Sequence, residues 1–168
     1  MAYSETTPTS KKPHDSAGSI ENGKRWRRKL LVLDTDHFSE WERGSAAGAR
    51  LRTRLGGAQA DMAVTVVTVE EQMRGWLAEI RRHKDPQRQI SPYAKFQRQV
   101  EAFADWMVLA WDADCAELFL DLRRQGLRLG TMDLKIGCIV MAHDATLLTR
   151  NAKDFAEVPG LRFENWLA

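Results

Sequence analysis

Five residues with oxygen-bearing side chains lie where apolar stretches of this sequence end or where a helix is expected to begin. They are Asp34, Glu71, Asp133, Asn151 and Asp154. Carboxylates that gather at one place repel one another and raise one another's pKa, and a bound divalent cation removes that cost. Sites built only from oxygen ligands suit Mg²⁺ or Mn²⁺. The sequence therefore predicts a site for one of these metals, with Asp34, Glu71 and Asp133 as its catalytic core.

Each of these residues also has a purely structural interpretation. The pattern Thr68-x-x-Glu71 matches a capping box, in which Glu71 only caps the helix backbone. Asp133 could complement a helix dipole, and Asp154 could cap a short turn. Asp34 has no such local partner, because it ends an apolar strand that is expected to be buried. The group of residues is therefore more informative than any single member.

Apolar runs mark the strands that would position these side chains. Strands are predicted at 30–33, 62–67 and 145–149, and shorter ones at 108–111 and 161–166. Because helical patterns alternate with these runs, we expect a parallel α/β sheet. The ligand site of such a sheet lies at the carboxyl ends of its strands, and the oxygen-bearing residues fall at those ends.

Helices are predicted between the strands from apolar spacing and from residues that stop a helix. Their expected ranges are 35–55, 68–83, 113–125 and 132–143. The segment 84–93 contains two prolines and is expected to be a polar connection. Beyond it, apolar residues recur at helical spacing and predict one buried stripe, which consists of Phe96, Val100, Phe103, Met107 and Ala110.

Length and charge are those of one globular domain. The chain has 168 residues and a net charge of +2, so it carries no strong overall field for nucleic acid. Basic clusters at 24–29 and 50–54 could attract phosphates or simply lie on the solvated surface. Residues 1–28 are rich in Ser, Thr, Pro, Gly and Lys and are expected to form a flexible tail, with the domain at 29–168.

The two cysteines, Cys115 and Cys138, sit in apolar patterns without metal-ligand spacing. We expect both to be reduced and buried, as is usual in cytoplasmic proteins. No apolar stretch is long enough to cross a membrane, and the first residues lack the hydrophobic region of a secretory signal. A cytoplasmic location without a membrane partner is predicted.

A resemblance to a known family rests on three segments, which are LLVLDTDHFSE from residue 30, VTVVTVEEQMRGW from residue 64 and GTMDLKIGCIVMAHDATLLTRNAKDFAEVPGLRFENW from residue 130. In this order and spacing, the chain resembles the PIN-domain nucleases, specifically the VapC-like toxins of bacterial type II toxin–antitoxin pairs. The last segment is the most specific, because a Gly stands three residues before Asp133 and an apolar strand leads into Thr-x-Asn and Asp-Phe. The resemblance implies a three-layer α/β/α fold with a central, mostly parallel sheet.

The resemblance also implies roles for the oxygen-bearing residues. Asp34, Glu71 and Asp133 match the family's first three metal-binding acids, and the implied cofactor is Mg²⁺ or Mn²⁺. The family's fourth position is often Asp, but this chain has Asn151, which can offer an oxygen but no charge. Asp154 is the nearest acid that could compensate. The implied partners are an RNA substrate, a cognate antitoxin protein and a second copy of the chain in a homodimer.

Six further residues are candidates for contacts around the metal or the substrate, and they are Thr35, Asp36, Ser39, Thr149, Arg74 and Lys135. The hydroxyls could hold ligands or phosphate, or could bond only to local backbone. Asp36 stands where the family commonly has Asn, and it could join the site or face the adjacent loop. Arg74 and Lys135 could touch the RNA backbone or lie on solvated helix surface.

Trp41 and Trp76 lie on helices that border the antitoxin groove in the resembled family, so they are candidate partner anchors. Trp106, Trp111 and Trp166 are expected in the core. His37, His83 and His143 show no metal-ligand spacing and are expected to be structural.

The predicted reaction is metal-assisted hydrolysis of an RNA phosphodiester bond. Asp34 and Asp133 would bind the metal, and Glu71 would bind it or orient the attacking water. One alternative is a non-catalytic PIN-fold module that binds RNA or protein, which the missing acid at Asn151 supports. Another is a phosphatase of the haloacid-dehalogenase type, suggested by the pair Asp34 and Asp36, although the late acidic pair of that family is missing.

Overall fold

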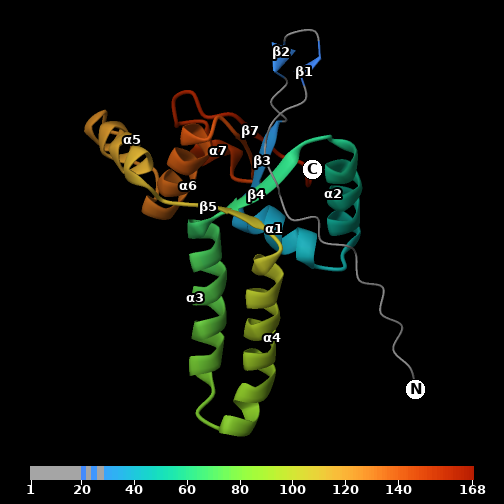
Figure 1. Cartoon of the computed structure of the whole chain (residues 1–168). Coiled ribbons are helices and arrows are strands. Elements are labelled where there is room, and N and C mark those ends of the chain that lie inside the picture. Colours follow the sequence, from blue (N-terminus) through green and yellow to red (C-terminus); the bar gives the residue numbers. More distant parts are fainter. Residues whose placement is uncertain (1–19, 22–23, 26–28) are drawn as a thin grey trace.

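A central sheet of five parallel strands organises the chain (Figure 1). The computed structural model describes residues 20–21, 24–25 and 29–168. The strand order is β5-β4-β3-β6-β7. In chain order the strands are β3 (Leu30–Leu33), β4 (Asp61–Thr65), β5 (Met107–Leu109), β6 (Thr146–Leu148) and β7 (Phe163–Glu164). The predicted parallel α/β sheet is therefore confirmed.

Seven helices belong to the described part of the chain. They are α1 (Thr35–Glu42), α2 (Ala46–Gly57), α3 (Val66–Arg82), α4 (Pro86–Ala104), α5 (Ala113–Arg124), α6 (Thr131–Ala142) and α7 (Ala152–Phe155). Before the sheet, β1 (Ile20–Glu21) and β2 (Lys24–Arg25) form a short antiparallel pair. The rest of the predicted tail lies outside the described residues, so the boundary at 28/29 stays a prediction. None of the described helices is both long and apolar enough to cross a membrane.

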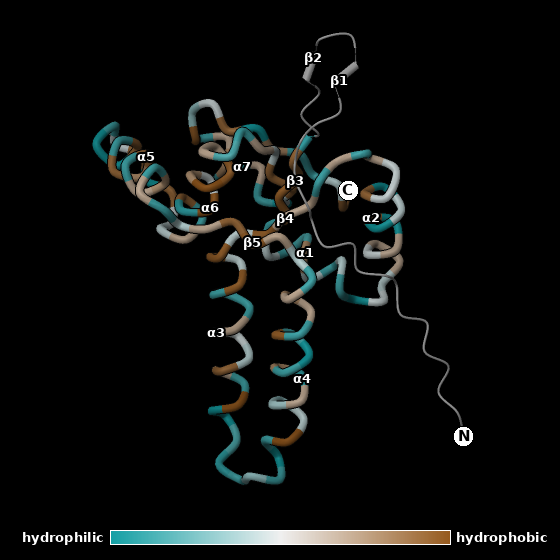
Figure 2. Tube along the Cα trace, in the orientation of Figure 1, coloured by the Kyte–Doolittle hydropathy of each residue, from teal (hydrophilic) through white to brown (hydrophobic). Residues whose placement is uncertain are grey.

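The alternation of side chains along the strands produces two apolar cores, one on each face of the sheet. Leu31 and Leu33 of β3 pack in one core with residues of α1 and α2, whereas Val32 packs in the other with residues of α5, α6 and α7. This arrangement is the predicted three-layer α/β/α fold. Cys115 and Cys138 are free and buried, as predicted. Figure 2 shows apolar residues concentrated on the strands, whereas α3 and α4 alternate between apolar and polar positions.

The order in which strands are added to the sheet changes side at β3: β4 and β5 lie on one side of it, and β6 and β7 lie on the other. β3 pairs in parallel with β4 on one side and with β6 on the other, so Val32 lies between Ala63 and Leu147. The crossover connections therefore leave β3 and β6 toward opposite edges, an arrangement that generally forms a crevice beyond the carboxyl ends of the two strands. This switch point is where parallel α/β sheets bind ligands.

The helix predicted over 35–55 is two helices, α1 and α2, separated by a break at 43–45. A Cβ atom at Gly48 would lie 2.0 Å from the carbonyl oxygen of Glu40, so the two helices meet at backbone contact. Ser45 caps α2 by accepting the Gly48 N–H at 2.9 Å, and it donates to the Glu40 carboxylate at 2.7 Å. The prediction of one helix was wrong because apolar spacing does not reveal a close backbone approach.

The segment 84–93 is mostly the beginning of α4 and not a polar connection. The Asp85 carboxylate caps this helix by accepting the Gln87 N–H at 3.0 Å. Pro86 stands in the first turn, where a backbone N–H would have no helical partner. Pro92 lies inside the helix and is buried. Reading both prolines as loop signals was therefore wrong.

The predicted apolar stripe after residue 95 is confirmed only in part. Phe103 is buried, but Val100 is 48 % exposed, and Met107 lies in β5 because α4 ends at Ala104. The remaining predicted elements lie within two residues of their expected bounds. Together, α3 and α4 form a helical hairpin that projects beyond the carboxyl edge of the sheet (Figure 1).

Candidate metal centre

Asp34 is held at the carboxyl end of β3 by hydrogen bonds to both carboxylate oxygens. The Thr35 N–H donates to Oδ1 at 2.8 Å, and the Thr149 hydroxyl, which follows β6, donates to Oδ2 at 2.7 Å. The side chain is buried, with the residue 8 % exposed. The pKa of Asp34 is raised to about 6, mainly by burial and to a smaller extent by the charges of Asp36 and Asp133, although the hydrogen bonds from Thr149 and Thr35 lower it. A cation beside this carboxylate would relieve that cost.

Glu71 lies in the second turn of α3, and its carboxylate accepts a hydrogen bond from the Thr35 hydroxyl at 2.5 Å. The capping-box interpretation of Glu71 is wrong, because Thr65 is the N-cap and accepts the Thr68 N–H at 3.0 Å. The Glu71 side chain is therefore free of the helix backbone and is directed toward α1. The hydrogen bond therefore places the carboxylate of Glu71 next to Thr35, the residue that follows Asp34.

Asp133 lies in the first turn of α6, beside Gly130. A Cβ atom at Gly130 would lie 3.4 Å from Oδ2 of Asp133. Burial raises the pKa of Asp133, and the negative charges of Glu71 and Asp154 add to that rise. Asp133 in turn raises the pKa of Asp34. Asp133 therefore lies between the other two predicted acids electrostatically, and a metal site shared by all three stays a prediction.

Asn151 and Asp154 close the same edge after β6. The Asn151 N–H donates to the Thr149 hydroxyl at 3.0 Å, and its side-chain amide donates to the Asp154 carboxylate at 3.0 Å. Thr149 therefore receives a bond from Asn151 and passes one to Asp34. The amide of Asn151 thus orients Asp154, and compensation by Asp154 for the acid missing at Asn151 stays a prediction.

Asp36 faces the adjacent loop, which is one of its two predicted alternatives. Its Oδ2 accepts the Arg150 N–H at 2.9 Å, and its Oδ1 lies 2.7 Å from Nδ1 of His37. Burial raises the pKa of Asp36, but these hydrogen bonds outweigh burial, so the pKa lies below its usual value. The fully buried His37 was expected to be structural. His37 is connected through Asp36 to Arg150, which lies far from it in the sequence, so no local sequence pattern could predict this connection.

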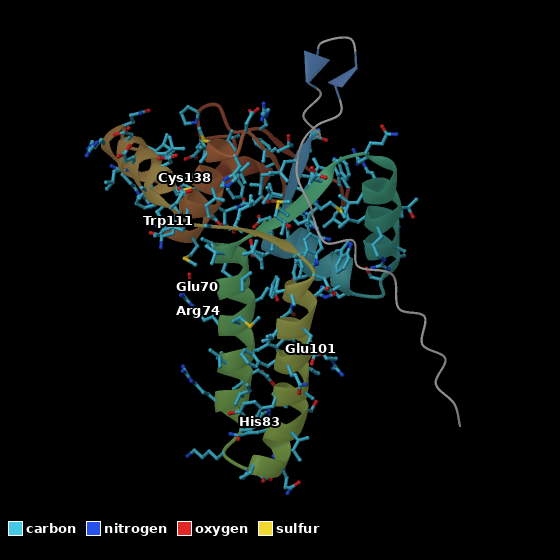
Figure 3. All side chains as sticks on the ribbon, in the orientation of Figure 1. Glu70, Arg74, His83, Glu101, Trp111 and Cys138 are labelled. Atoms are coloured by element: carbon cyan, nitrogen blue, oxygen red, sulfur yellow. The ribbon has the colours of Figure 1, made fainter. Side chains whose placement is uncertain are left out.

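The other predicted contact residues lie around this centre in different ways. The Ser39 hydroxyl accepts from Gln72 of α3 at 2.8 Å, so Thr35 and Ser39 both bond to α3 side chains instead of local backbone. Arg74 pairs with Glu70 on the exposed surface, and both lie on the side of α3 away from α4 (Figure 3). Lys135 stands 5.5 Å from the ring centroid of Trp111.

The donor set fits a hard divalent cation by its chemistry. All of the candidate ligands offer oxygen, which Mg²⁺ and Mn²⁺ prefer. Within the described ranges, no three His, Cys, Asp or Glu side chains already stand close enough together to hold an ion. Mg²⁺ usually keeps several waters and binds through one or two carboxylates. Asp34, buried and within the electrostatic influence of Asp133, is the strongest candidate for such a carboxylate ligand.

Most of the chain matches a known protein family. The family model described as PIN domain matches residues 31–161. This chain belongs to the PIN-domain family. The match extends from β3 to the residues just before β7, so it includes every candidate metal ligand.

Individual PIN-domain proteins resemble the chain at moderate identity. Ribonuclease VapC2 of Rickettsia felis is 38 % identical over 63 residues, which cover 35 % of this chain and 47 % of that protein. The aligned part thus spans about half the length of that relative. The tRNA(fMet)-specific endonuclease VapC of Shigella flexneri is 27 % identical over 140 residues, covering 81 % of this chain and 97 % of that protein.

A solved structure supports the same fold. A toxin–antitoxin complex from Klebsiella pneumoniae contains a chain that is 25 % identical, with a TM-score of 0.57. The superposition covers 78 % of this chain and 94 % of the other. The three-layer arrangement described above is therefore that of PIN-domain toxins.

Proposed function

We propose that this PIN-domain protein is a divalent-metal-dependent endoribonuclease and the toxin component of a toxin–antitoxin pair. The observation that carries the proposal is the buried Asp34, which Thr149 fixes at the crevice beyond β3 and β6 while the charge of Asp133 acts on it. The names of the Rickettsia and Shigella relatives, a ribonuclease and a tRNA-specific endonuclease, support RNA as the substrate.

Each residue has a role that follows from its contacts. Asp34 and Asp133 would hold the ion, and Asn151 would offer it an amide oxygen or hold one of its waters. Glu71, restrained by Thr35, would orient the attacking water and accept its proton. When bound, Mg²⁺ or Mn²⁺ lowers the pKa of a coordinated water and screens the phosphate oxygens.

Two protein partners follow from the same proposal. The Klebsiella structure supports a cognate antitoxin, because the related chain is described there in a toxin–antitoxin complex. The resemblance adds a homodimer and a cytoplasmic location. Light scattering of the purified chain would measure its mass in solution, and a monomer at micromolar concentration would contradict the dimer.

The alternative of a non-catalytic RNA-binding module rests on Asn151, which replaces an acid. Against it, clustered carboxylates repel phosphate unless a cation is bound, and Asp34, Glu71 and Asp133 are all present. The haloacid-dehalogenase alternative is wrong, because the chain belongs to the PIN-domain family. Asp36 is moreover occupied by the Arg150 backbone and His37.

The direct test is RNA cleavage by the purified protein in Mg²⁺ or Mn²⁺, with and without EDTA. We expect cleavage that EDTA abolishes and that Asp34→Asn and Asp133→Asn remove. Asp121→Asn, which changes an exposed acid of α5, is the matched control and should cleave normally. Absence of both cleavage and Mn²⁺ binding would favour the binding module.

A further inference from the structure

A groove with a volume of about 340 Å³ begins beside the metal centre and follows α3. Its lining residues are Glu71, Gln72, Gly75, Trp76 and Glu79 of α3 and Lys95 of α4. From Glu71 to Glu79 the helix rises by about 12 Å, so the groove extends from a candidate metal ligand toward the tip of the hairpin. Any strand held at the metal centre can continue into it.

The indole of Trp76 has a fixed orientation in this groove. Its Nε1–H donates to Oε1 of Gln99 at 3.3 Å, and Nε2 of Gln99 donates to Glu42 at 3.0 Å. Gln99 is buried, whereas Trp76 is only half-buried. Next to it, Gly75 has no side chain, and a Cβ atom there would meet nothing within 4 Å. A rigid aromatic surface with open space beside it results.

A cation lies over one face of this ring. Nζ of Lys95 is 5.8 Å from the ring centroid of Trp76, and Lys95 forms no ion pair within the described part of the chain. Glu79, by contrast, is neutralised by Arg82 at 2.9 Å and lies 3.5 Å from His83. The groove therefore combines one flat aromatic ring, one unpaired positive charge and, at one end, a carboxylate of the metal centre.

We propose that this groove binds a nucleotide of single-stranded RNA next to the cleaved bond, with its base on Trp76 and its phosphate at Lys95. This inference rests on the proposed ribonuclease function. Stacking on an aromatic ring accepts any base, because every base has a π face. Lysine binds phosphate as a point charge. Trp76 and Lys95 would therefore contribute affinity without selecting a sequence.

The lining favours a nucleotide over a protein segment. Trp76 is the one large apolar side chain among the six lining residues, and the others are charged, amide-bearing or Gly. The buried centres of protein interfaces are instead depleted in Lys and Glu. That Trp76 anchors an antitoxin stays a prediction, which competes with this role in substrate binding.

The test measures RNA binding without cleavage. Fluorescence anisotropy of a fluorescein-labelled single-stranded RNA of mixed sequence is titrated in Mg²⁺ with the full chain carrying Asp34→Asn, which is expected not to cleave and serves as the unaltered chain in this assay, and with variants made on that background. Trp76→Leu should bind about tenfold more weakly, because it keeps an apolar side chain but loses the π face. Trp76→Phe should stay within about threefold of the original chain. Lys95→Ala should weaken binding and reduce the slope of log K against log salt by about 0.7.

Two matched variants control for indirect effects. Phe119→Leu removes an aromatic ring that also carries a cation, Arg123 at 5.1 Å, but lies on α5 outside the groove. Arg98→Ala removes a positive charge from α4 at a residue that does not line the groove. Both should bind RNA as the unaltered chain does. Circular dichroism and thermal melting check folding, and Lys95→Ala carries the test if Trp76→Leu unfolds.

The outcomes separate this proposal from the ribonuclease proposal. Unchanged RNA binding by Trp76→Leu and Lys95→Ala would overturn the proposal that the groove binds RNA. This is also the result expected if the groove binds a protein segment instead. Equal losses in Phe119→Leu and Arg98→Ala, or no RNA binding by the unaltered chain, would also overturn the proposal. If Trp76→Leu binds RNA tenfold more weakly but the protein shows no metal-dependent cleavage, the RNA-binding role of the groove is supported and the ribonuclease activity is contradicted.

Discussion

Nε2 of His37 accepts a hydrogen bond from the backbone N–H of Trp166 at 3.1 Å, across 129 positions of the sequence. Because Nε2 accepts, Nδ1 carries the proton and donates it to Asp36 at 2.7 Å. Asp36 in turn accepts the Arg150 N–H. One buried imidazole thus connects α1, the loop after β6 and the segment after β7.

His37→Ala should destabilise the protein, because it leaves the Trp166 N–H and one Asp36 oxygen without partners. Each unsatisfied buried group costs about 1–3 kcal/mol, so we expect a loss of about 2 kcal/mol or more in urea unfolding. His83→Ala at the end of α3, where the side chain is partly exposed, should change stability by less than about 0.5 kcal/mol. Similar losses in the two variants would contradict the connecting role of His37.

Gly48→Ala should separate α1 from α2. The added Cβ would lie 2.0 Å from the Glu40 carbonyl oxygen and 2.7 Å from that of Arg43, so the helices must move apart at a cost of about 1–3 kcal/mol. Gly56→Ala in the same helix meets no atom within 4 Å and should be neutral or stabilising by up to about 1 kcal/mol. Thermal unfolding of both variants checks the opposite signs.

Thr149→Val should weaken metal binding while keeping the size of the side chain. It removes the 2.7 Å hydrogen bond that orients Oδ2 of Asp34, and losing such a supporting bond lowers metal affinity by about tenfold or more. Calorimetric titration with Mn²⁺ measures the change. Thr53→Val, which removes an exposed hydroxyl bonded to the Ala49 carbonyl, is the control, and an equal loss there would refute the role of Thr149.

The two cysteine thiols should be unreactive in the folded protein. Burial raises the pKa of Cys138 to about 11 and raises that of Cys115 as well. At pH 8, therefore, only about one Cys138 thiol in a thousand is a thiolate, the reactive form. A colorimetric disulfide reagent should label neither thiol before denaturant is added and both afterwards. Rapid labelling of the native protein would mean that these side chains become exposed.

The parts of the fold that depend on local periodicity could be predicted from the sequence. The four apolar residues of β3 end at Asp34, and that one boundary locates both a strand and a site residue. The break between α1 and α2 could not be predicted, because it depends on the backbone contact at Gly48. The start of α4 was missed because Pro86 suits a first helical turn as well as a loop.

The candidate site divides in the same way. The placement of Asp34 directly after a strand and of Asp133 in the first turn of a helix could be predicted, because parallel strands bring such residues to one edge; their role as metal ligands stays a prediction. The hydrogen-bond partners of the acids could not be predicted, since Thr35 and Glu71 meet only through the packing of α1 against α3. The groove at Trp76 likewise depends on how α4 lies beside α3, with Lys95 contributed across the hairpin.

The strand order also determines when this centre can form during synthesis. The central strand β3 is made first, but its neighbour β6 and the hydroxyl that orients Asp34 come 115 residues later. Thr149 must therefore emerge from the ribosome before β6 can pair with β3 and the Thr149 hydroxyl can bond to Asp34. The proposed metal centre can therefore form only late in translation, after α1 to α6 have been synthesised.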